Sequence, residues 1–118
     1  MQHRPVIKTA IPKRRYQIGN HTAALLGEID SSDHQFYRYI LAWVPTGQRD
    51  PVLYVCAEHT PPKERADGAY RLRVVSENMT DVLDTSDGWG DLETFAEQAL
   101  NLGMQMLGLT QARIDRLL

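Results

Sequence analysis

One stretch near the end of the chain has the strict periodicity of an amphipathic helix. Between residues 91 and 107 the apolar side chains fall within one arc when each residue is turned by about 100°. Asp91 is placed to cap the first turn, and Gly108 is placed to end the helix. A helix with one apolar stripe must bury that stripe against another layer. The residues ahead of it must therefore supply the layer on which this helix lies.

The centre of this apolar stripe is occupied by small residues, Ala96, Ala99 and Gly103. A glycine inside a helix costs about 1 kcal/mol relative to alanine, so Gly103 needs a structural reason. We expect that reason to be the close approach of a bulky group, either aromatic side chains from a sheet or a second helix. Replacement of Gly103 by leucine is then expected to destabilise the fold through overpacking.

The sequence before the helix is divided into short segments that are typical of β-strands. Residues 36–44 and 52–58 are rich in aromatic and β-branched side chains, and residues 69–77 alternate apolar with polar ones. Turn residues separate these segments, and no crossover helix lies between them. The predicted fold class is α+β: an antiparallel β-meander of about five strands with one C-terminal helix packed across one face. We further expect a short helix in residues 110–118.

The length and charge of the chain limit its organisation and its partners. With 118 residues, of which 42% are hydrophobic, it can form one domain with an ordinary core. Residues 1–15 carry five basic residues and no acid, whereas acidic residues outnumber basic ones in the remainder. We predict a basic, poorly ordered N-terminal arm at residues 1–15 and a single α+β domain at residues 16–118. The acidic body argues against a broad nucleic-acid surface.

Several functional classes lack their sequence signatures. The chain has no apolar run of transmembrane length, and its first residues lack a continuous apolar secretion signal, so a cytoplasmic location is the default expectation. The single cysteine, Cys56, cannot form an internal disulfide. A metal or Cys–His site would require a hairpin to bring His34 and His59 together near Cys56. We predict no catalytic residues, no metal site and no cofactor.

The two central predicted strands are apolar on both faces, unlike those of a half-exposed sheet. One helix covers only one face. The second face must then be covered by the N-terminal arm, the terminal segment, curling of the sheet, a second copy of the chain or a ligand. The candidate binding surface consists of aromatic and arginine residues: Tyr37, Tyr39, Trp43, Tyr54, Arg71 and Arg73.

Alternatives stay open for both kinds of residue in this candidate surface. The aromatic side chains are equally consistent with a core beneath the helix. The two arginines could hold a carboxylate or phosphate, but such residues more often form ion pairs with acids on neighbouring strands, here Glu28 or Glu58.

These features favour a small non-enzymatic protein-binding or adaptor domain that associates through its sheet, with a protein partner or with itself as a homodimer. This function predicts an apolar patch, rimmed by polar groups, on the face away from the helix. The alternative is a small-molecule-binding protein or enzyme with an aromatic pocket between sheet and helix. That function predicts a concave cavity beneath the helix.

Overall fold

The computed structural model describes residues 1–33 and 35–118, which form one antiparallel sheet covered by one α-helix. The sheet has seven strands in the order β6-β5-β4-β3-β2-β1-β7. The strands are β1 (Ile7–Ile18), β2 (His21–Ser31), β3 (Tyr37–Pro45), β4 (Leu53–His59), β5 (Tyr70–Ser76), β6 (Thr80–Ser86) and β7 (Ile114–Arg116). Because β1 to β6 follow one another as neighbours, the predicted α+β meander is confirmed, with seven strands in place of about five.

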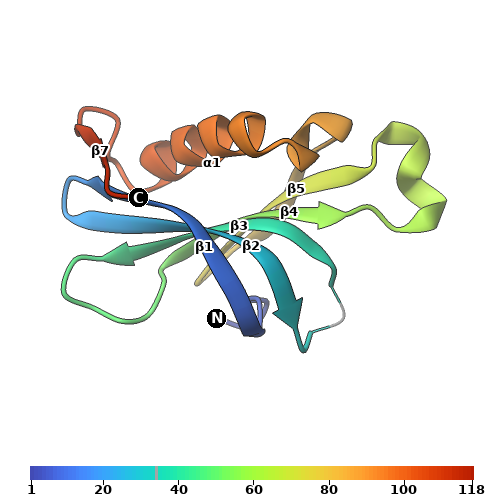
Figure 1. The fold of residues 1–118 in the computed structure, drawn as a ribbon, viewed down its shortest axis with the longest axis horizontal. Helices are drawn as coiled ribbons and strands as arrows, with labels where there is room; N and C mark the ends of the chain where they lie inside the picture. Colours follow the sequence, from blue (N-terminus) through green and yellow to red (C-terminus); the bar gives the residue numbers. More distant parts are fainter. Residues whose placement is uncertain (34) are drawn as a thin grey trace.

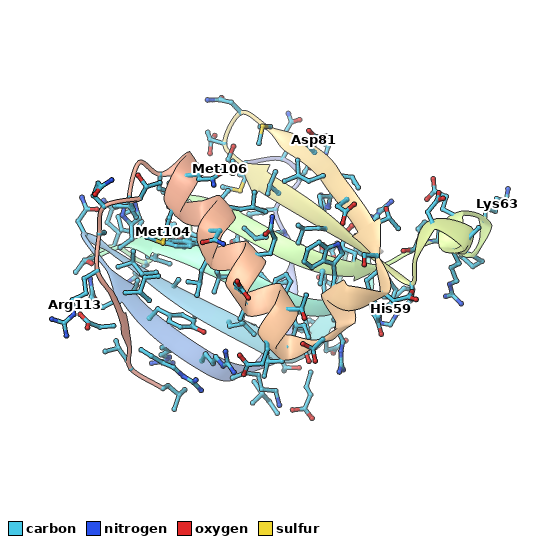
Figure 2. All side chains as sticks on the ribbon, turned by 90° about the horizontal axis from the view of Figure 1, so that it is seen from above. His59, Lys63, Asp81, Met104, Met106 and Arg113 are labelled. Atoms are coloured by element: carbon cyan, nitrogen blue, oxygen red, sulfur yellow. The ribbon has the colours of Figure 1, made fainter. Side chains whose placement is uncertain are left out.

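The helix α1 (Leu92–Met106) lies across one face of the sheet (Figure 1). Its predicted cap is present, since the Asp91 carboxylate accepts a hydrogen bond from the Thr94 amide at 3.0 Å. Two short 3-10 helices complete the connections. The first, η1 (Pro62–Asp67), carries Lys63 beyond the end of the sheet (Figure 2), and the second, η2 (Asp87–Gly90), leads from β6 into α1.

Large side chains fill the layer between α1 and the sheet. Trp43 and Phe95 are fully buried there, and the Tyr39 ring stacks on Phe95 with centroids 5.6 Å apart. Gly103 lies directly over Trp43, so that an added Cβ at residue 103 would overlap the indole ring. The small residues at the centre of the helix therefore make room for an aromatic side chain from the sheet.

The last residues differ from the prediction, because residues 114–116 form a strand and not a helix. The strand β7 pairs with β1 through Tyr16 and Arg116 and through Ile18 and Ile114. Gly108, with φ +69°, turns the chain after α1. The free edge of β1 offers backbone hydrogen bonds to any extended segment, and this pairing outweighs the weak helical pattern of residues 110–118.

The basic segment at residues 1–15 is divided between an extended lead and the sheet. β1 begins at Ile7 and pairs with β2, so the predicted boundary between residues 15 and 16 falls inside a strand. The preceding residues run alongside the sheet, where Val6 accepts a hydrogen bond from the Ser32 amide at 2.8 Å and donates one to Asp33 at 3.3 Å. Pro12 lies next to a register shift in β1, where a missing amide hydrogen is tolerated.

Candidate interaction surface of the sheet

The six residues of the predicted binding surface divide between the two faces of the sheet. Tyr39 and Trp43 point toward α1 and belong to the core beneath it. The other face is called the far face from here on. It carries the remaining four residues, Tyr37, Tyr54, Arg71 and Arg73.

A β-bulge explains why Tyr37 and Tyr39 face opposite sides although they are two residues apart. Tyr37 pairs with Glu58 and Tyr39 pairs with Ala57, so β3 contains one extra residue, Arg38, at this point. The extra residue reverses the alternation of side chains along the strand. Simple alternation along residues 36–44 would place both tyrosines on one face, and the bulge separates them.

Part of the far face forms a second, smaller core. Its buried residues are Tyr37, Ile40, Ala42, Tyr54, Cys56 and Val75. Met1, Ile7 and Ile29 pack against this cluster. The N-terminal residues and the bending of β1 and β2 beneath the central strands thus cover this part (Figure 1).

A buried ion network lies beside this second core. The fully buried Glu58 carboxylate accepts hydrogen bonds from Arg71 Nε at 2.9 Å and from Arg73 Nε at 2.7 Å. Arg73 also donates to the Tyr37 hydroxyl at 3.3 Å, and that hydroxyl donates to Asp33 at 2.6 Å. Of the two acids expected as partners of the arginines, Glu58 is the one that binds both. Both arginines are hydrogen-bonded to Glu58, so the network links β4 to β5 and leaves neither arginine as a free anion-binding group, while Asp33 Oδ1 has no hydrogen-bond partner among the described residues.

Two titratable groups of the far face, the Tyr37 phenol and the Cys56 thiol, are held in their neutral forms. The pKa of the Tyr37 phenol is raised far above its ordinary value, mainly by burial and to a smaller extent by the hydrogen bond to Asp33. Burial likewise raises the pKa of the Cys56 thiol. Both groups stay protonated at neutral pH, and Cys56 serves as a small apolar core residue.

The histidine and cysteine residues considered for a metal site are not brought together in the described part of the chain. Cys56 faces the buried cluster, whereas the His59 ring lies against Tyr70 with centroids 5.0 Å apart. His34 lies outside the described residues. Among the residues that the structure describes, no group of three or more His, Cys, Asp or Glu side chains is arranged to hold a metal ion.

Next to this cluster, and sharing Ala42 with it, the far face has an open, mainly apolar hollow of about 290 Å³, called the far-face groove. Its floor lies where Ala24 of β2 pairs with Ala42 of β3. Leu117 is the residue directly after β7. It is 63% exposed and lies at the rim of the groove. Further lining residues are Arg15, Thr22 and Val44. Sequence reasoning missed this groove because small side chains in separate strands carry no chemical signature until the strand order is known.

Comparison with known proteins identifies no relative. No family model, no curated protein and no solved structure matches the chain. None of the helices in the described residues is long and apolar enough to cross a membrane.

Proposed function

We propose that this chain is a protein-binding domain that associates with a second copy of itself through the far-face groove. The proposal rests on one observation: the far-face groove and the exposed side chain of Leu117 lie next to each other on the same surface. Ala24 and Ala42 form the floor, and the exposed Leu117 stands beside it. A twofold interface uses one patch of each copy, so each patch must contain both the receiving and the inserting part.

The composition of the groove supports the same proposal. Two sheets that pack face to face lie about 10 Å apart, and small floor residues such as Ala24 and Ala42 permit this approach. Arg15 and Thr22 add polar groups to an otherwise apolar lining. An apolar centre with a polar border is the usual composition of a protein interface.

The layer beneath α1 gives less support to the alternative, a small-molecule site. The Trp43 indole occupies the space directly under Gly103, and Trp43 and Phe95 are fully buried. A ligand would have to displace these packed aromatic rings, at the cost of the contacts that hold the helix. Association through the sheet is therefore the favoured function.

Sedimentation velocity over concentrations from about 1 µM to about 1 mM tests the proposal. We expect the sedimentation coefficient of the unmodified chain to rise with concentration toward the value of a dimer. The variant Leu117→Asp should remain a monomer, because it removes the projecting apolar side chain and puts in its place a charge that would have to lose its water on association. Phe36→Asp is the matched control, since Phe36 is also highly exposed but does not line the groove.

Two outcomes would contradict the proposal. In one, the unmodified chain sediments as a monomer at every concentration. In the other, Leu117→Asp and Phe36→Asp weaken the dimer equally, which would mean that exposed apolar area in general, and not the groove, causes the association.

A further inference from the structure

The border of the sheet formed by β6 has an unpaired backbone. β6 is the outermost strand on the side opposite β7, and Figure 2 shows Asp81 at this border. Ser76 donates a hydrogen bond to Met79 at the β5–β6 turn. In an antiparallel ladder, residue pairs that exchange backbone hydrogen bonds alternate with pairs that do not. Ser76 and Met79 form a hydrogen-bonded pair, so the backbone N–H and C=O groups of Thr80 and Val82 point away from β5. No strand of the described chain pairs with this outer side, so its donors and acceptors are open to another extended segment.

The exposed side chains of β6 differ between its two sides. Val82, which is 43% exposed, pairs with Arg73 and so lies on the far face. Asp81 and Asp84 both lie on the side of α1, because a register shift adds one residue, Leu83, between Val82 and Asp84. An added strand would therefore meet an apolar group on one side and carboxylates on the other.

The α1 side of this border is acidic, whereas the far face beside β6 carries Arg71 and Arg73, which are both paired with Glu58. Between residues 74 and 112 the sequence contains seven acidic residues and no lysine, arginine or histidine. Glu93 is paired with Arg14, but the described residues provide no ion-pair partner for Asp81 or Asp84. A field of one sign attracts segments of the opposite charge and repels those of the same charge.

A hollow of about 200 Å³ opens beside Val82 on the far face. Thr60 lines it and is only 2% exposed, and its hydroxyl oxygen has no hydrogen-bond partner among the described residues. A buried hydroxyl without a partner is costly, so a donor that enters the hollow would be stabilised. The side chain of an added strand that stands opposite Val82 is placed to reach it.

We propose that the open edge of β6 binds an extended polypeptide segment in which basic side chains alternate with small or apolar ones. The backbone of the segment extends the sheet, its basic side chains face Asp81 and Asp84, and the alternate side chains face Val82 and the hollow. A second copy of β6 fits poorly, because it would place the aspartates of two strands side by side, and like charges across strands are destabilising.

A synthetic peptide of about nine residues that alternates lysine with threonine, a small side chain whose hydroxyl can donate a hydrogen bond to Thr60, is the probe, with a glutamate–threonine peptide as its counterpart. We expect the lysine peptide to bind with amide shifts centred on residues 79–86 in NMR spectra. The glutamate peptide should bind at least about tenfold more weakly.

Two variants of the chain locate the binding on β6. Val82→Pro removes an outward amide hydrogen while it spares the bonds to β5, and Asp81→Lys reverses one charge. Each should weaken binding of the lysine peptide at least about tenfold. Glu97→Lys is the matched control, because it changes the net charge equally on the exposed side of α1 and should alter the affinity by less than about twofold.

Any of four results would overturn the proposal: no binding by the unmodified chain, amide shifts away from β6, equal losses in Asp81→Lys and Glu97→Lys, or self-association that Val82→Pro abolishes. The far-face groove lies near the opposite border of the sheet. Leu117→Asp should therefore leave the peptide affinity unchanged, so that failure of one proposal does not imply failure of the other.

Discussion

Among single residues, Gly103 decides how closely α1 approaches the sheet. The Trp43 indole occupies the space that a Cβ at residue 103 would need. Gly103→Ala should therefore lower the free energy of unfolding by about 1–3 kcal/mol through overpacking, although alanine is the better helix former. Urea unfolding followed by circular dichroism measures this change. The control is Asn101→Ala on the exposed side of the same helix, which should be neutral or stabilising.

A smaller side chain beneath Gly103 tests whether overlap with Trp43 causes the loss of stability in Gly103→Ala. In a Trp43→Phe background the smaller ring leaves room for the added methyl group, so the penalty of Gly103→Ala should shrink. An equal penalty in both backgrounds would show that Trp43 is not the side chain that limits the approach of the helix.

Between elements, an ion pair fastens the start of α1 to β1. The buried Arg14 side chain donates hydrogen bonds to both carboxylate oxygens of Glu93 in the first helical turn. The helix dipole also favours a negative charge at this position. The hydrogen bonds from Arg14 hold the pKa of Glu93 below its ordinary value, and the amide of Thr94 does the same for the pKa of Asp91.

Acid should therefore weaken the attachment of the helix. A carboxylate with a depressed pKa stabilises the fold above its unfolded pKa, which is 4.5 for Glu93, and loses this contribution as the pH falls through the folded pKa. We expect Glu93→Gln to be less stable than the unmodified chain near about pH 7, and the difference to shrink below about pH 4.5. Urea midpoints over this range measure it, and Glu97→Gln serves as control. A difference that stays constant at every pH would contradict this role.

In the whole molecule, the N-terminal residues close part of the far face. Met1 and Ile7 pack against the cluster that contains Cys56, and Val6 is hydrogen-bonded to the β2–β3 connection. Deletion of residues 2–6 should expose this cluster, so the Cys56 thiol should react faster with a disulfide reagent under native conditions. Leu117→Asp, on the open part of the far face, should leave the rate unchanged. An unchanged rate after the deletion would mean that the curl of β1 and β2 suffices as a cover.

Patterns among near neighbours in the chain determined the elements and their broad arrangement. The spacing of apolar residues between 91 and 107 predicted the helix and its buried side, and Asp91 marked its start. The small centre of the stripe predicted the close approach of a bulky group, either aromatic side chains or a second helix, and the structure shows that this group is Trp43. Short connections without crossover helices predicted the antiparallel meander. These features depend on residues a few positions apart, and the physical preferences that produce them act locally.

Only the tertiary structure decided how the faces and borders are used. The bulge at Arg38 depends on the register between β3 and β4. No residue type in the sequence therefore predicts that Tyr37 and Tyr39 lie on opposite faces of the sheet. β7 forms because β1 has a free edge, a fact that depends on strand order. The far-face groove and the open border at β6 likewise exist only once distant strands are neighbours. Strand register and strand order are set by contacts across the whole chain, which the periodicity of one segment does not contain.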